Sequence, residues 1–286
     1  MSRSRLDAPR GVLQRRAPAN RISHERFHPA PALAPFIEHF WSVRWDLRGL
    51  PAIQAETLPH PCIHWIFERG RGQLTGVQTR RFRRRLSGQD RVFGIKFRPA
   101  AFQPFLGAPL SRLTDRTVSA RPVFGPAGEA LRDAILAESE VLRCVALAEE
   151  FLLARIPDLP AEILLLRDLV ERLARDPDIT RMEQVAALAG LPVRQLQRRF
   201  NAAVGVSPKW VLQRYRLHEA ALRLEAEDAP DMASLALHLG YFDQSHFIRD
   251  FKSVVGQSPG EYAAEARAIR RDTNARTAPQ KRSSPR

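Results

Sequence analysis

Two stretches of this sequence follow one pattern: residues 200–208 read FNAAVGVSP and residues 251–259 read FKSVVGQSP. Identical residues recur at an offset of 51, as Phe200/Phe251, Gly205/Gly256, Ser207/Ser258 and Pro208/Pro259. Farther upstream the matches shift to an offset of 50, as in Met182/Met232, Ala186/Ala236 and Gly190/Gly240. The chain therefore holds two copies of one supersecondary unit, and the second copy has one extra residue after its glycine.

Each copy has the pattern of a helix-turn-helix. In the first, we expect Thr180 to cap a short helix, with Glu183 completing a capping box. Gly190 supplies the turn, and a second helix follows over residues 192–204. The buried face of this helix is apolar, whereas its other face carries Arg194, Gln197, Arg198 and Asn201.

The second copy repeats the scaffold but changes the outward face. Phe247 and Phe251 pack inward, and the outward positions or the helix start hold Gln244, Ser245, His246, Ile248 and Arg249. Arginine and glutamine are the side chains that pair bidentately with guanine and adenine edges. Among the outward positions only Arg198 and Arg249 are an identical pair. Two modules that contact different bases would diverge in this way, although a merely solvated polar face needs no identity either.

A linker helix joins the two copies. Ser207 caps it, Pro208 starts it, and it ends near residue 227. Some 18 residues of helix span roughly 27 Å. Such a spacer would set two recognition helices about one DNA turn, roughly 34 Å, apart.

These residues resemble the AraC/XylS family of transcriptional regulators. The match rests on residues 186–200, 205–208 and 215–217, and above all on LGYFDQSHF at 239–247 with residues 251–252 and 256–259. The resemblance implies an all-α domain that binds promoter DNA through two helix-turn-helix units. The family's base-reading positions fall on Arg194, Gln197, Arg198, Gln244, Ser245, His246 and Arg249. Two residues depart from the family pattern. Pro192 stands where a capping Ser or Thr is common, and Ile248 is apolar where a polar residue is common, so we do not expect Ile248 to read a base.

The first half of the chain predicts a different architecture. From about residue 27 to 122, short apolar runs broken by Pro and Gly indicate strands, best placed at 36–47, 63–67, 74–77 and 92–97. Two helices follow between residues 128 and 155, with a break near Ser139, and another runs from 161 to about 174. We therefore expect an α+β, β-rich domain over 25–160 and an all-α DNA-binding domain over 161–264. Its units fall at about 180–204 and 231–255, joined by the helix at 208–227.

The N-terminal half also resembles a domain attached to this kind of DNA-binding unit. The resemblance rests on residues 33–41, 58–60, 76–79 and 94–99. It implies a domain of mixed β and α structure that senses a small effector or dimerises, with a cupin-like fold as one hypothesis.

The N-terminal half holds one candidate for further chemistry. His60, Cys62 and His64 alternate on a predicted strand, so they would share one face, and these residue types bind zinc. Pro61 interrupts the strand pattern, and buried small and polar side chains explain the same residues. Similarly, Trp41, Trp45 and Trp65 with Phe40 and Phe67 form either the wall of a pocket or ordinary core. The sequence shows no catalytic motif, so we expect no enzyme, no cofactor and no metal.

The run of residues 80–85, RRFRRR, also has two interpretations. It is either an exposed strand or loop with alternating charge, or a surface for dimer contacts or an acidic ligand.

Composition adds the setting. The net charge is +14, yet residues 179–262, which hold the repeat, contain ten basic and nine acidic residues. Residues 1–21 and 263–286 each carry a net +5, and we expect basic disordered segments over 1–24 and 265–286. Charged tails add salt-sensitive attraction to phosphates but no sequence recognition. Two cysteines and no long apolar run predict a cytoplasmic protein, associated with the nucleoid through DNA.

The sequence thus predicts a promoter-binding transcriptional regulator that responds to a small effector. Its expected partners are double-stranded promoter DNA and RNA polymerase, with a small-molecule effector and a second copy of the chain as further hypotheses, and no membrane. Two alternatives stay open. The N-terminal domain dimerises without a ligand, or it is a metal-binding enzyme fused to a DNA-binding unit.

Overall fold

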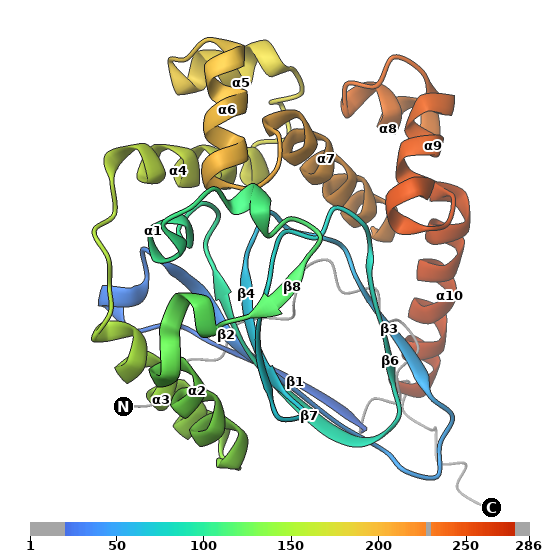
Figure 1. Cartoon of the computed structure of the whole chain (residues 1–286). Coiled ribbons are helices and arrows are strands. Elements are labelled where there is room, and N and C mark those ends of the chain that lie inside the picture. The colour runs from blue at the N-terminus through green and yellow to red at the C-terminus, as the bar shows by residue number, and fades with distance from the viewer. Residues whose placement is uncertain (1–20, 227–229, 278–286) are drawn as a thin grey trace, which may run out of the picture. The chain divides into compact units, whose positions relative to one another are not determined.

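The structure is a computed structural model that describes residues 21–226 and 230–277 (Figure 1). The chain forms two compact units, one ending at Arg216 and the other beginning at Leu217. The predicted fold class is confirmed, because a strand-rich region precedes a helical one. Within the described ranges, no helix is long and apolar enough to cross a membrane.

The first unit is built on a six-stranded antiparallel sheet. In spatial order its strands are β1 (Ile22–Phe27), β2 (Ile37–Leu47), β7 (Gly88–Phe97), β4 (His64–Glu68), β5 (Arg71–Thr75) and β8 (Thr117–Ser119). A separate ribbon pairs β3 (Ile53–Thr57) with β6 (Phe82–Leu86). The sequence predicts β2, β4, β5 and β7, whereas β1, β3 and β8 are short or polar strands that it does not signal.

Strand β1 corrects the predicted N-terminal extension. Residues 22–24 belong to this strand, where Ile22 pairs with Trp45 of β2. The polar sequence of β1 suits a strand at the edge of a sheet, where only one side is paired. Residues 1–20 lie outside the described residues.

The two faces of the sheet separate the aromatic residues. Phe40, Trp65 and Phe67 lie in the main core, while Trp41 and Trp45 lie on the opposite face beside the ribbon. Successive side chains of a strand point to opposite faces, so these residues do not wall one pocket, and the core interpretation is confirmed.

Helices α2 (Arg121–Ala137) and α3 (Val141–Leu153) pack against the sheet, as Figure 1 shows. The Trp65 ring stacks on Phe124 of α2 with 4.3 Å between ring centroids and meets Phe151 of α3 edge-on at 5.6 Å. The predicted break near Ser139 is confirmed. The short segments η1 (Pro31–Leu33), α1 (Gln103–Leu106) and η2 (Leu110–Arg112) complete this part of the chain.

Four helices continue the chain: α4 (Ala161–Arg175), α5 (Met182–Ala189), α6 (Val193–Ala203) and α7 (Pro208–Glu225). One hydrophobic core runs from Phe27 in β1 to Leu212 in α7. Residues on both sides of the predicted boundary near residue 160 therefore pack in the same compact unit.

The second unit contains the end of α7 followed by α8 (Met232–His238), α9 (Gln244–Val255) and α10 (Pro259–Thr277). Helix α10 enters the region that the sequence predicts to be a disordered tail from residue 265. Its first turn is anchored, since Tyr262 is buried and donates its hydroxyl hydrogen to Glu225 at 2.5 Å. Residues 278–286 of the predicted tail lie outside the described residues.

Candidate nucleic-acid interface

The first helix-turn-helix is formed by α5 and α6. Gly190 makes the turn with φ +62°, a left-handed conformation that favours glycine. The backbone N–H of Gly190 donates to Ala187 at 3.1 Å, and that of Leu191 donates to Ala186 at 3.2 Å. The buried face consists of Val185, Ala189, Leu196, Phe200 and Ala203. The repeat thus predicts this scaffold correctly.

The start of α5 differs from the prediction. The helix begins at Met182, which makes Arg181 the flanking residue and Gln184 the third helical residue. Gln184 Oε1 accepts hydrogen bonds from the backbone N–H groups of Thr180 at 3.0 Å and Arg181 at 2.9 Å. The predicted cap by Thr180 and Glu183 is wrong by one residue, and Gln184 takes over the stabilising contact.

The outward face of α6 presents the predicted reading residues to solvent. Arg194, Gln197 and Arg198 are exposed, and within the described residues no hydrogen bond or ion pair holds them. Arg199, one position farther along, is half-buried and forms an ion pair with Glu162 of α4 at 3.3 Å. The helix therefore separates one structural arginine from two arginines that are available to a ligand.

The second helix-turn-helix is formed by α8 and α9, and an aspartate caps the N-terminus of each of these helices. Asp231 accepts hydrogen bonds from Ala233 and Ser234 at the start of α8, each at 3.0 Å. Asp243 accepts one from the backbone of His246 at 2.7 Å at the start of α9. Carboxylates suit helix N-termini because unpaired N–H groups point toward them. Both caps fix the backbone of the unit.

The outward face of α9 is again exposed. All four predicted positions, Gln244, Ser245, His246 and Arg249, are accessible, whereas Ile248 is half-buried. The His246 ring meets Tyr241 edge-on at 5.2 Å, and its Nε2 lies 3.6 Å from Asp250 Oδ2. Burial of Ile248 agrees with the argument against base reading by that residue. Contact of the other side chains with DNA stays a prediction.

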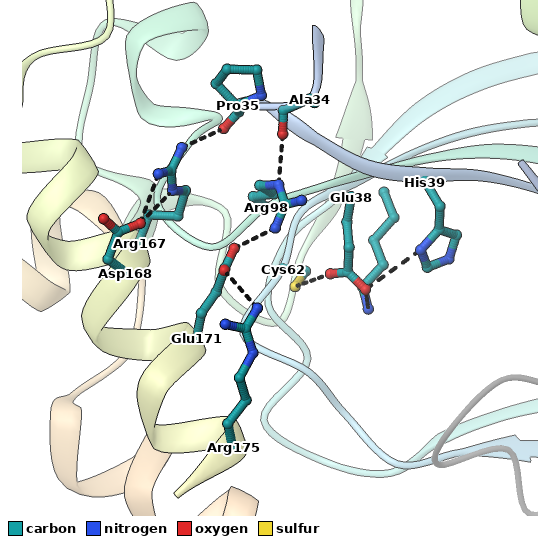
Figure 2. Close-up of polar contacts among 11 residues, drawn as sticks. Ala34, Pro35, Glu38, His39, Cys62, Arg98, Arg167, Asp168, Glu171 and Arg175 are labelled. Carbon is teal, nitrogen blue, oxygen red and sulfur yellow. Dashed lines mark hydrogen bonds and ion pairs between the residues drawn. The ribbon is translucent and has the colours of Figure 1, made fainter. Parts of the chain in front are cut away.

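The sequence gives little sign of the polar contacts that join the strand-rich region to α4–α7 inside the first unit. Arg98, at the end of β7, pairs with Glu171 of α4 at 2.5 Å and donates to the Ala34 carbonyl at 2.6 Å (Figure 2). Arg167 of α4 donates to the Pro35 carbonyl at 3.2 Å. Arg98 thus bridges α4 and the segment between η1 and β2, and Arg167 joins α4 to that segment directly.

Two more contacts reach the helices that follow α4. Thr114 Oγ1 donates to the Gly205 carbonyl at 2.5 Å, directly after α6. Arg214 of α7 is buried and donates to the Thr79 carbonyl at 2.9 Å. Thr79 is braced in turn by Asp115, which accepts hydrogen bonds from its backbone N–H and its hydroxyl, each at 2.6 Å. The strand-rich region thus holds the end of α6 and the middle of α7.

A cluster of ionisable side chains, in which His39, Cys62 and Lys96 are buried and Glu38 is half-buried, lies beside these contacts (Figure 2). Lys96 Nζ pairs with Glu38 Oε1 at 2.8 Å, His39 Nδ1 lies 3.4 Å from the same oxygen, and Cys62 Sγ donates to Glu38 Oε2 at 3.9 Å. Burial alone would raise the pKa of Glu38, but the charge of Lys96 and the His39 hydrogen bond outweigh it and lower that pKa. The cluster therefore combines one carboxylate with one ammonium group.

The predicted alternation of His60, Cys62 and His64 on a strand is wrong. Strand β4 begins only at His64, and Cys62 donates its backbone N–H to the His60 carbonyl at 2.8 Å in a tight turn around Pro61. Burial raises the pKa of Cys62 to about 12 and lowers that of His64 to about 3. Across the described ranges, no three His, Cys, Asp or Glu side chains are placed to hold a metal ion.

The arginine-rich run at 80–85 is largely a structural strand. Residues 82–86 form β6, and the arginines pair with glutamates: Arg81 and Arg83 with Glu56 at 2.7 and 3.1 Å, and Arg84 with Glu68. The strand interpretation is confirmed. Glutamates thus pair with three of the five arginines, while Arg80 and Arg85 are exposed, and binding of an acidic ligand or a dimer partner by this run stays a hypothesis.

Comparison with known proteins matches the strand-rich region and the helix-turn-helix region to separate families. A family model described as a helix-turn-helix domain matches residues 185–265, and one described as a domain of unknown function, DUF6597, matches residues 25–119. ToxT from Vibrio cholerae O395, a solved structure, aligns over 79% of this chain and 98% of its own with 11% identity. Its TM-score of 0.37 is too low to establish a common fold.

The similar curated proteins are transcriptional regulators. The transcriptional activator NphR from a Rhodococcus species is 38% identical over 96 residues, 34% of this chain and 28% of that protein. The HTH-type transcriptional regulator MtrA from Neisseria gonorrhoeae is 33% identical over 99 residues, 34% and 32% of the two chains. A protein described as AraC-like from Streptomyces antibioticus is 35% identical over 91 residues, 32% and 30%.

The chain thus spans about a third of the length of the relatives that it matches. The C-terminal part of the chain is a helix-turn-helix domain, and it is similar in sequence to these transcriptional regulators, one of which is described as AraC-like.

Proposed function

We propose that this protein is a sequence-specific regulator of transcription that reads promoter DNA with α6 and α9. One observation carries the proposal: Arg198 and Arg249 occupy the same position in two copies of one scaffold, and both are exposed. An arginine in that position of a recognition helix suits the O6 and N7 atoms of guanine. The names of the relatives support a role in transcription.

The differences between the copies predict an asymmetric target. Arg194 and Gln197 of α6 correspond to Ser245 and Ile248 in the second copy, so the two helices present different donors. Helix α7 is continuous from Pro208 to Glu225 and provides the proposed spacer between the units. We propose that one chain reads two dissimilar half-sites about one helical turn, roughly 10 base pairs, apart.

Selection from a random pool of double-stranded DNA tests this function. The full-length protein should enrich a site with two unlike blocks of recurring bases. The same site should occur in the promoter regions to which the protein binds in cells. Equal retention of all sequences would contradict the proposal, because phosphate contacts alone give that result.

We further propose that the strand-rich region regulates the DNA-binding helices. The contacts Thr114 to Gly205 and Arg214 to Thr79 support this proposal, because they connect that region to the end of α6 and to α7. A small effector that shifts η2 or the loop after β5 would act on both contacts. A strand-rich region that only dimerises is the competing proposal. It predicts that Thr114→Val leaves the affinity for the selected DNA site unchanged, whereas a regulatory contact predicts a changed affinity.

The remaining partners follow from this role. We propose RNA polymerase as the protein partner, a second copy of the chain as a dimer partner, and the cytoplasm as the site of action. We propose no catalysis for this chain, since the role requires no reacting residue. A transcription assay with purified polymerase and the selected site tests whether the protein acts on polymerase directly.

A further inference from the structure

Phe242 stands out among the apolar side chains of this protein because its exposed fraction is 97%. In the described part of the chain, other large exposed apolar side chains are 37–51% exposed, apart from Leu237 at 75%. Single exposed apolar residues are common on protein surfaces, but nearly all retain some packing. Phe242 has almost none, although its backbone is firmly fixed on both sides.

The neighbours of Phe242 explain why its ring points to solvent. Tyr241 is buried, donates its backbone N–H to the Ala236 carbonyl at 3.0 Å, and packs its ring against Phe247 at 5.4 Å. Asp243 caps α9 through the backbone of His246. Since Tyr241 already fills the inward position, the following residue is forced outward, immediately before the recognition helix.

The internal repeat identifies this part of the turn as different between the two copies. The offset changes from 50 at Gly190/Gly240 to 51 at Phe200/Phe251, so one residue is added between these points in the second copy. Leu191 follows the first turn glycine and is half-buried, whereas the second copy has Tyr241 inside and Phe242 outside. The longer turn thus places an aromatic ring beside the outward face of α9.

We propose that Phe242 is a further DNA-reading residue of the second helix-turn-helix, which packs its ring on the 5-methyl group of a thymine in the major groove. This inference rests on the proposed function. The N-terminal residues of a recognition helix are those that approach base edges, and Phe242 lies two residues before Gln244, the first residue of α9. The thymine methyl is the apolar group that the major groove offers, and phenylalanine contacts it.

Electrostatics permit the approach. Asp243 is the acidic neighbour of Phe242 in the sequence, and its Oδ1 is engaged with the N-terminus of α9 at 2.7 Å. The positive end of the helix therefore offsets this charge. Arg249, on the same helix, is exposed and adds a positive charge to the face that we propose to meet DNA.

The test uses full-length protein and the DNA site selected from the random pool, with each thymine replaced in turn by deoxyuridine, which lacks the methyl group. Wild-type protein should lose about fourfold in affinity at one thymine, the value of burying one methyl group. On the thymine site, Phe242→Ala should bind more weakly than wild type by a similar factor. On the deoxyuridine site, Phe242→Ala and wild type should bind with equal affinity. Leu237→Ala, the matched exposed apolar control, should bind as wild type does.

Each other result overturns the inference. Phe242→Ala that binds as tightly as wild type, or that retains the full deoxyuridine penalty, shows that the ring does not contact a methyl group. Unchanged DNA affinity combined with lost activation in the polymerase assay would assign Phe242 to a protein partner instead. Failure to select any DNA site would refute the proposed function itself, which separates the two outcomes. Urea unfolding should give equal stability for Phe242→Ala and wild type, because the removed ring is exposed.

Discussion

Thr114 Oγ1 donates a hydrogen bond to the main-chain carbonyl oxygen of Gly205, with 2.5 Å between the two oxygens. Thr114 follows η2 in the strand-rich region, and Gly205 lies directly after recognition helix α6. The approach is close: a Cβ on Gly205 would lie 3.2 Å from the Leu110 carbonyl oxygen, and the glycine has φ +93°. The recognition helix is therefore anchored at its C-terminal end by the region that we propose to be regulatory.

Replacing Thr114 should measure the strength of this anchor. Thr114→Val keeps the shape but removes the donor, so we expect the free energy of unfolding to fall by about 1 kcal/mol. Thr114→Ser keeps the hydroxyl and should stay close to wild type. Urea unfolding of the three proteins provides the comparison, and equal losses for valine and serine would show that the hydrogen bond contributes nothing.

The Glu38–Lys96 pair should be important for stability at neutral pH. Glu38→Gln leaves the ammonium group of Lys96 buried without its carboxylate, and we expect a loss of about 2 kcal/mol. Lys96→Met should cost less, because the Glu38 side chain is 35% exposed and regains water. Chemical unfolding at pH 7 checks the order of the two variants. A larger loss for Lys96→Met would contradict the account.

The same pair predicts a pH dependence. Lys96 and His39 hold the pKa of Glu38 below its usual range against the effect of burial. The stabilisation is then fully present above the pKa of the unfolded chain, about 4.3, and is lost as the pH falls toward the folded value. The stability difference between wild type and Glu38→Gln should be constant from about pH 6 to 8 and shrink below about pH 5. A difference that grows on acidification would be inconsistent with this sign.

Both cysteines should resist modification in the folded protein. Burial raises the pKa of Cys62 to about 12 and also raises that of Cys144, so both thiols are neutral at pH 8. The thiolate is the reactive form. Ellman's reagent should label neither cysteine quickly in native protein and both after unfolding in urea. Rapid labelling of Cys62→Ala would mean that Cys144 is accessible, and rapid labelling of Cys144→Ala would mean the same for Cys62.

The sequence predicts the helices of the second half well because buried positions recur at a fixed offset. Phe200 and Phe251 are both fully buried, as their repetition suggests. The capping error at Thr180 has a local cause, since a shift of one residue exchanges Glu183 for Gln184 as the capping side chain. Strand β1 cannot be recognised in the sequence because its residues are mostly polar. It pairs with β2, where Ile22 lies opposite Trp45, a residue more than 20 positions away.

The contacts that join the regions cannot be predicted from local patterns. Thr114 and Gly205 are 91 residues apart, and Arg98 and Glu171 are 73 apart. Neither pair belongs to a periodic motif, and each depends on how the sheet and helices pack. The predicted reading residues are different, because exposure on a repeated helix follows directly from the spacing of the buried residues.

The central claim concerns Arg198 and Arg249, and their removal tests it most directly. Fluorescence anisotropy should compare the affinity of wild type, Arg198→Ala and Arg249→Ala for the selected site and for unrelated DNA, with the exposed Arg143→Ala as a control. We expect each recognition-helix variant to lose about 1–3 kcal/mol on the selected site and much less on unrelated DNA. If both variants bind the selected site as wild type does, or lose equally on both DNAs, then α6 and α9 do not read the sequence through these arginines.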